Sequence, residues 1–152
     1  AFLLQAGAEN GKNTMNYFGR TPTWLASKAG DDELVRSLIH AGADINRPDN
    51  ELKSPLWIAS LRDDVQVARL LVDASADVDK PDNADATPLW IASSSGHSAV
   101  AELLVKAGAD VDKVNHKGNS ALWIACFHGK VEVARLLIKA RADSDKANHQ
   151  CE

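Results

Sequence analysis

One seven-residue segment returns four times along this chain, and no other feature limits the possible folds as strongly. Its clearest copy, residues 87–93, reads Thr-Pro-Leu-Trp-Ile-Ala-Ser. The copies lie 33 residues apart and hold all the tryptophans of the 152-residue chain, namely Trp24, Trp57, Trp90 and Trp123. A fixed period of this length is typical of a stacked repeat array, because one such unit is too small to close a core and must bury its apolar face against its neighbours.

Each unit predicts two short helices joined by a turn and followed by a long polar loop. In the unit 87–119, Thr87 is a favourable N-cap and Pro88 suits the first helical position, where its missing N–H costs nothing. Gly96 and Gly108 then end the first and the second helix. The second helix has an apolar face at the i, i+3, i+4 spacing, formed by Val100, Leu103 and Leu104.

These residues resemble the ankyrin repeat family, whose pattern runs roughly T-P-L-H-x-A-A, then G-H-x-x-V-x-x-L-L, then G-A-D-V-N. Four full units match, at 21–53, 54–86, 87–119 and 120–152, and residues 1–20 match the back half of another. The resemblance implies an all-α solenoid of stacked antiparallel helix pairs with projecting hairpin loops, formed as one domain over 1–152. The last unit has no polar outer face, so the chain is expected to be a fragment of a larger protein.

The tryptophans depart from the family pattern, which has histidine at this position. Histidine can donate and accept hydrogen bonds between neighbouring loops, whereas tryptophan offers only one N–H donor but a larger apolar surface. We expect the four side chains to be largely buried and to form a structural ladder between repeats. The alternative is an exposed aromatic stripe used for recognition.

A second departure is the loss of turn glycines in and around the unit 54–86. Non-glycine residues replace them at Leu52, Asp63, Ser75 and Asp85, and Arg141 makes one such change in the last unit. Because side chains disfavour positive φ, these turns are predicted to be strained or reshaped, and the unit should be the least stable of the four. It is also acidic, with seven Asp against three basic residues. A solvated face explains this charge, and an electrostatic site for a basic partner is the alternative.

Several function classes find no support in the chain. The net charge of −4 argues against a nucleic-acid-binding surface, and no apolar run is long enough to cross a membrane. No phosphate loop, nucleophile elbow or zinc-binding helix motif occurs, so no catalytic residue, cofactor or metal is expected. His116 and His149 with Cys151 are potential metal ligands, but no two of them have the short sequence spacing of a typical zinc-ligand pair. The paired Asp residues after each second helix are attributed to loop structure: Asp77, Asp79, Asp110, Asp112, Asp143 and Asp145.

The two cysteines provide no disulfide framework. Cys126 stands where the other units have serine, which predicts a small packed thiol. Free thiols suit a reducing compartment, and no signal peptide is visible, so an intracellular, cytoplasmic location is expected.

The resemblance implies a protein-binding scaffold or adaptor that acts as a monomer and meets its partner in a concave groove and at the hairpin tips. The alternative is a substrate-recruiting or regulatory domain of an enzyme whose catalytic part lies elsewhere. Four of the expected contact residues are large and apolar where polar ones would suffice, so Tyr17, Phe18, Leu61 and Phe127 are the candidate anchors. The whole expected set is Tyr17, Phe18, Arg20, Lys28, Asn50, Glu51, Lys53, Leu61, Arg62, Asn83, Ser94, Ser95, His116, Lys117, Asn119, Phe127 and His128.

Overall fold

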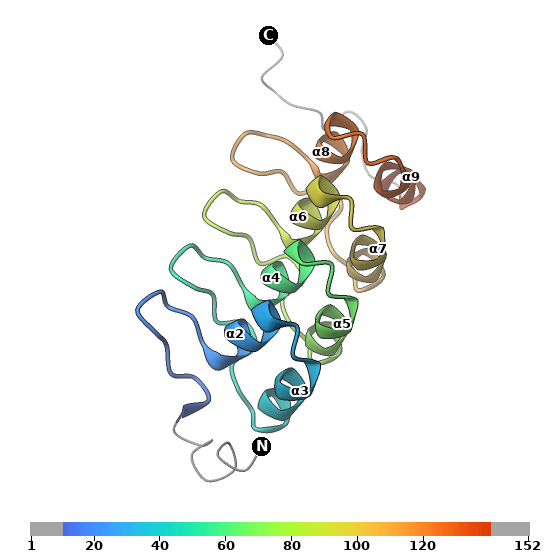
Figure 1. Cartoon of the computed structure of the whole chain (residues 1–152). Coiled ribbons are helices and arrows are strands. Elements are labelled where there is room, and N and C mark those ends of the chain that lie inside the picture. Colours follow the sequence, from blue (N-terminus) through green and yellow to red (C-terminus); the bar gives the residue numbers. More distant parts are fainter. Residues whose placement is uncertain (1–10, 141–152) are drawn as a thin grey trace.

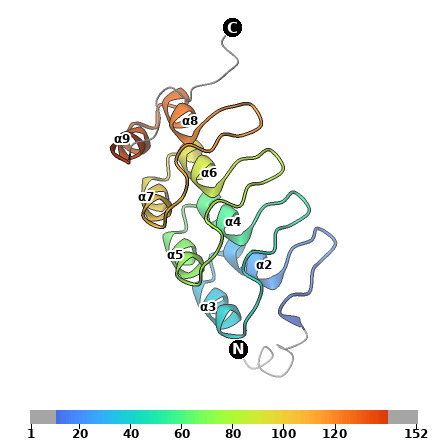
Figure 2. The ribbon, with the colours of Figure 1, turned by 180° about the vertical axis from the view of Figure 1, so that it is seen from behind.

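The computed structural model describes residues 11–140, in which four helix pairs stack side by side (Figure 1). The first helices form one row, α2 (Pro22–Ala29), α4 (Pro55–Leu61), α6 (Pro88–Ser95) and α8 (Ala121–Phe127). The second helices form a parallel row, α3 (Asp32–His40), α5 (Val65–Asp73), α7 (Ser98–Lys106) and α9 (Val131–Lys139). Figure 2 shows the second row from behind, with the long loops projecting away from it. The predicted all-α solenoid is confirmed.

Each first helix begins as the repeated segment predicts. The Ser or Thr before it is in the extended conformation, and its hydroxyl accepts the backbone N–H of the tryptophan three residues later. For Thr87 and Trp90 this distance is 3.1 Å. Pro88 follows Thr87, where its fixed φ suits the helix and no donor is lost. Gly96 then ends α6 in the left-handed region, with φ of 86°.

The core runs along the stack between the two rows of helices. Equivalent positions of successive pairs supply it, so the same side-chain types recur at the same depth. The fully buried residues include Leu56, Leu89, Val67, Val100, Val133, Leu71, Leu104 and Leu137. Each first helix packs on the first helix of the next pair and on its own second helix. This contact pattern makes the stability of the array a sum of local and nearest-neighbour terms.

The lost turn glycines leave strained turns rather than reshaped ones. Leu52, Asp63, Ser75 and Asp85 all keep positive φ, between 58° and 66°. Asp63 and Ser75 therefore adopt the conformation that Gly30 and Gly108 adopt in equivalent turns, at 73° and 89°. Arg141 lies outside the described residues. Because four strained positions fall in or next to residues 54–86, we still expect these amides to open before those of 87–119 in native-state hydrogen exchange.

Ser75→Gly should raise the free energy of unfolding by about 1 kcal/mol, because the exposed Ser75 side chain contributes strain without packing. The matched change is Gly108→Ser, one repeat later. A Cβ atom at Gly108 meets no atom within 4 Å, so only the backbone strain should appear, as a loss of about 1 kcal/mol. Urea unfolding measures both. Equal stability of Ser75→Gly and the parent chain would contradict the assignment of strain to this turn.

The hairpin loops are held by side-chain acceptors at fixed positions. Asp49 Oδ1 accepts the backbone N–H groups of Glu51 and Lys53, both at 3.0 Å. Asp82 and Asn115 form the same turn in the next two loops. Neighbouring loop tips are also joined through the backbone, since Asn83 N donates to Glu51 O at 3.1 Å and the same bond recurs between the other tips. The loops therefore form one continuous, internally bonded face.

The Asp residues after the second helices are part of this loop structure, as predicted. Asp77 Oδ1 accepts the N–H of Asp79 at 3.0 Å, and Asp79 Oδ1 accepts the N–H of Asp110, one repeat on, at 3.1 Å. Asp110 Oδ1 in turn accepts the N–H of Asp112 at 3.0 Å. The carboxylates thus satisfy backbone donors within and between repeats. Asp143 and Asp145 lie outside the described residues, as do His149 and Cys151.

The prediction for Cys126 is wrong, because its thiol is exposed. The equivalent serines of the earlier helices are fully buried, and Ser93 Oγ donates to Leu89 O at 2.7 Å. Each of these serines lies on a first helix that packs on the first helix of the next pair. In the part of the chain that the structure describes, no further first helix packs on α8, and the thiol stays open.

Candidate binding groove

A groove lined by the hairpins and the row of first helices contains two hollows. The first, of 190 Å³, lies over α2 and α4 and includes Trp24, Lys28 and Leu61. The second, of 520 Å³, lies over α6 and α8 and includes Trp90 and Phe127. Both hollows share Trp57, which makes the surface continuous from the first repeat to the last.

The tryptophans connect each repeat to the next, as the ladder hypothesis predicts. Trp24 Nε1 donates to Lys53 O at 3.0 Å, and Trp57 Nε1 donates to Ala86 O at 3.1 Å. Trp90 Nε1 donates to Asn119 O at 3.1 Å. Each acceptor is the residue before the N-cap of the next first helix. A single N–H donor therefore suffices, because the acceptor is a backbone carbonyl.

The burial predicted for the tryptophans is nearly complete for two of them and partial for the other two. Trp24 and Trp57 are 2% and 4% exposed. Trp90 and Trp123 are only partly buried. The indole N–H of Trp90 is bonded while part of its ring faces the groove, so this residue has a structural contact and an exposed aromatic surface together.

The difference in burial follows from the residue four positions before each tryptophan. The Arg20 guanidinium lies 4.2 Å from the centre of the Trp24 ring, and the Lys53 ammonium lies 5.0 Å from the centre of the Trp57 ring. These long side chains cover the indoles and gain cation–π attraction. The equivalent residues in the next two repeats are Ala86 and Asn119, which leave Trp90 and Trp123 open.

The structure brings most of the predicted contact residues to this groove. The first hollow is lined by six of them, Arg20, Lys28, Glu51, Lys53, Leu61 and Arg62. The second is lined by four, His116, Lys117, Asn119 and Phe127. The other seven lie at hairpin tips or helix ends outside both hollows, namely Tyr17, Phe18, Asn50, Asn83, Ser94, Ser95 and His128.

The exposure of the predicted residues varies. Twelve are exposed, while Arg20, Lys53, Ser94 and Ser95 are partly buried. Asn119 is an exception, because it is buried at 8% exposure and its backbone joins the loop to Trp90. Asn119 N also donates to Asn115 Oδ1 at 3.0 Å, so the backbone of this residue maintains the loop.

Two histidines of the set join neighbouring repeats. His116 Nδ1 donates to Ala84 O at 2.8 Å. His128 Nδ1 donates to Ser94 O at 2.9 Å and lies 3.2 Å from Ser94 Oγ. Each of these two rings therefore has a structural hydrogen bond in addition to its exposed edge.

Leu61 and Phe127 occupy the same place at the end of their helices and are exposed at 41% and 68%. Phe127 stacks on Trp123, with ring centres 4.9 Å apart and an angle of 11° between the planes. This stack accounts for one face of the phenyl ring and leaves the other uncovered. Tyr17 and Phe18, at the first hairpin tip, are exposed at 92% and 55%.

The acidic residues of 54–86 do not form an open acidic face on the groove. Asp64 caps α5, accepting the N–H of Val67 at 3.0 Å, and Asp82 is buried in its turn. Glu51 is the exposed carboxylate of the first hollow, and its hydrogen bond and charge pairing with Lys53 lower its pKa from the usual value. The Asp side chains are used mainly for caps and turns, which explains their density without a basic partner.

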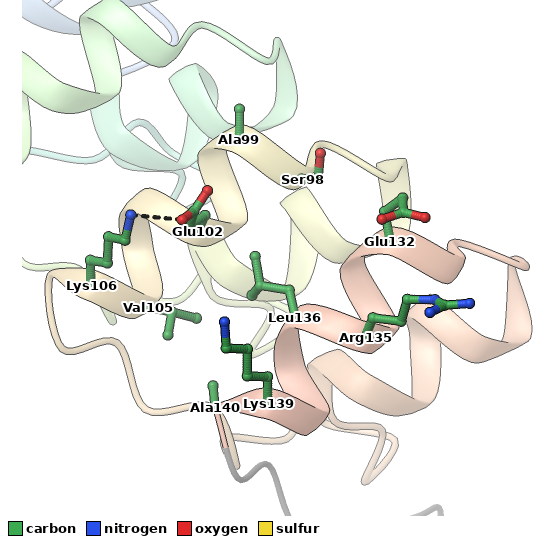
Figure 3. Close-up of a pocket in the computed structure, with 10 residues that line it drawn as sticks. All are labelled: Ser98, Ala99, Glu102, Val105, Lys106, Glu132, Arg135, Leu136, Lys139 and Ala140. Atoms are coloured by element: carbon green, nitrogen blue, oxygen red, sulfur yellow. Dashed lines mark ion pairs between the residues drawn. The ribbon is translucent and has the colours of Figure 1, made fainter.

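A third hollow, larger than these two, lies in the other row of helices, between α7 and α9 (Figure 3). It measures 670 Å³, and its rim carries charged side chains, including the ion pair of Lys106 and Glu102 at 2.6 Å. None of the predicted contact residues lines it. The groove is the better candidate because its aromatic side chains are both exposed and held in place.

Some residues that line the groove were not in the contact set predicted from the sequence, because they were expected to be structural. Trp90 and Trp123 line the second hollow, together with Ile91 and Ile124. The available signal was the short side chain four residues before each of these tryptophans, at Ala86 and Asn119. The equal spacing of the tryptophans suggests one uniform ladder and does not by itself reveal this difference in the preceding side chain.

The stacked helix pairs, the bonded hairpins and the groove define a helical repeat protein. The family model for ankyrin repeats (three copies) matches residues 1–82 and 76–148, so the chain belongs to the ankyrin repeat family. Members of this family are generally non-catalytic modules for protein–protein interaction. A comparison with curated proteins found no match. None of the helices within 11–140 is long and apolar enough to cross a membrane.

Proposed function

We propose that this chain is a monomeric scaffold or adaptor domain that binds a protein partner in the groove and at the hairpin tips. The observation that supports this most strongly is the presence of large exposed apolar side chains along the groove and at a hairpin tip. Leu61 and Phe127 line the two hollows and are 41% and 68% exposed, Phe127 stacks on the partly open Trp123, and Phe18 at the first hairpin tip is 55% exposed. Exposed apolar groups gathered on one surface are typical of interaction sites.

The rigidity of this surface favours binding. Its tryptophans are hydrogen-bonded across repeats and its loop tips are joined through the backbone, so few groups must be ordered when a partner arrives. A preformed surface loses less conformational entropy on association than a flexible one. Aromatic side chains held in place are also the usual energetic centres of protein interfaces.

Leu61→Ala and Phe127→Ala test the proposal once a partner has been isolated by pull-down. At least one of them should weaken the affinity by about 1–2 kcal/mol, because each removes an exposed apolar anchor. Ile138→Ala is the matched control, since Ile138 is 61% exposed but lies on α9 in the other row. Lys106→Ala on α7 is a second control. Titration calorimetry measures the affinities, and circular dichroism checks that each variant is folded.

Unchanged affinity in both groove variants would contradict the proposal. A loss confined to Ile138→Ala or Lys106→Ala would instead place the partner on the row of second helices.

A further inference from the structure

The first hollow differs in charge from the chain as a whole. Four cationic side chains line it, from Arg20, Lys28, Lys53 and Arg62, whereas the chain carries a net charge of −4. Two carboxylates, from Asp49 and Glu51, share the hollow. The contacts of these two carboxylates determine how much of the positive charge can interact with a ligand.

Both carboxylates are already engaged. Asp49 is 4% exposed, its Oδ1 accepts two backbone N–H groups, and its Oδ2 lies 3.7 Å from Arg20 Nε. Glu51 forms an ion pair with Lys53. Within residues 11–140, no ion pair involves Lys28 or Arg62. These two exposed cations therefore remain available on the rim of the hollow.

The second hollow has a different lining at the equivalent positions. Lys28 is replaced by Ser94 and then Phe127, and Arg20 by Ala86 and then Asn119. Its carboxylate, Asp82, is buried and accepts the N–H groups of its own turn. The exposed indole surface of Trp90 and Trp123 and the ring of Phe127 make this hollow mainly apolar. Lys117 is the one Lys or Arg that lines it, against four in the first hollow, so the groove changes from mainly cationic to mainly aromatic along the stack.

We propose that the occupant of the groove is a peptide segment with two or more carboxylates at one end and large apolar side chains at the other. Its acidic end lies over α2 and α4, near Lys28 and Arg62, and its apolar end lies over α6 and α8. This inference rests on the proposed function, which it makes more specific. Complementary charge fixes the direction of the segment and rejects basic competitors, because like charges brought together are repelled.

A peptide fits this surface better than a nucleic acid does. Phosphate backbones are bound by extended basic stripes, and here four of the five Lys and Arg side chains that line the two hollows lie at one end of the groove, in a protein of net negative charge. The aromatic second hollow matches apolar side chains. An oligonucleotide is therefore included in the test as the competing ligand.

The experiment is a selection from a displayed library of random peptides on the folded chain. The recovered peptides should be enriched in Asp and Glu, depleted in Lys and Arg, and should carry aromatic or aliphatic residues on one side of the acidic ones. A double variant, Lys28→Glu with Arg62→Glu, should recover apolar peptides without the acidic excess. Both side chains are exposed, so the variant should keep its fold, as circular dichroism would check.

A synthetic copy of one selected peptide then gives the affinity by fluorescence anisotropy. The groove double variant should weaken binding about tenfold or more, since two favourable charge contacts become repulsive. The control is Arg36→Glu with Arg69→Glu, two exposed positions on α3 and α5 with the same change in net charge. It should weaken binding by less than about threefold, because long-range effects are screened at physiological salt.

The outcomes separate this inference from the proposed function. Peptides without acidic excess whose binding is still lost in Phe127→Ala would overturn the inference and leave the groove function intact. Equal losses in the two double variants would also overturn it. Binding insensitive to every groove substitution, or no recovered peptide, would contradict both. A single-stranded oligonucleotide that displaces the peptide at similar concentration would assign the cations to phosphate instead.

Discussion

Trp57→Ala should lower the free energy of unfolding by about 4 kcal/mol, one of the two largest effects expected from a single change in this chain. The side chain is 4% exposed, so its removal leaves a large cavity between repeats. It also removes the Nε1 hydrogen bond to Ala86 O, which then keeps only the bond from the Asp82 N–H. The lost buried hydrogen bond adds about 1 kcal/mol to the loss. Urea unfolding followed by circular dichroism measures the change.

The matched substitution is Trp123→Ala in the last described helix pair. Trp123 is partly exposed and stacks on the exposed Phe127, so the loss should be less than half of that for Trp57→Ala. Equal losses in the free energy of unfolding for the two substitutions would contradict the role of Trp57 as a buried link between repeats.

Leu89→Ala should lower the free energy of unfolding by about 3 kcal/mol, because Leu89 is fully buried at the centre of the stack. Leu25→Ala is the control on another first helix. Leu25 is 44% exposed, so its truncation should cost less than about 1 kcal/mol. A loss below about 1 kcal/mol for Leu89→Ala would mean that the stack closes around the cavity and is less tightly packed than the structure indicates.

The arrangement of helices could be predicted because residues in each repeat mark where its helices begin and end. A hydroxyl N-cap precedes each first helix, and the 33-residue period places every helix against its equivalent neighbour. The positive φ of Ser75 and Asp63 could also be anticipated as one of two possibilities, by comparison with the glycines of other repeats. Local chemistry and repetition were sufficient for these features.

Burial at the groove could not be predicted from repetition, because it depends on side chains that differ between repeats. Trp57 and Trp90 occupy equivalent positions and donate equivalent hydrogen bonds, but Lys53 covers one and Ala86 leaves the other open. Cys126 is exposed for a similar reason, since its burial would require a further first helix packed on α8. The surface proposed for binding therefore depends on the positions where the side chains differ between repeats.

The most direct test of the groove as the partner site is a hydrogen-exchange footprint of the complex. With the partner bound, amides of α2, α4, α6, α8 and the hairpin tips should exchange more slowly than in the free chain. Amides of α5, α7 and α9 should be unchanged, because they lie in the other row. Protection confined to α5, α7 and α9, with the hairpin tips and first helices unaffected, would contradict the account.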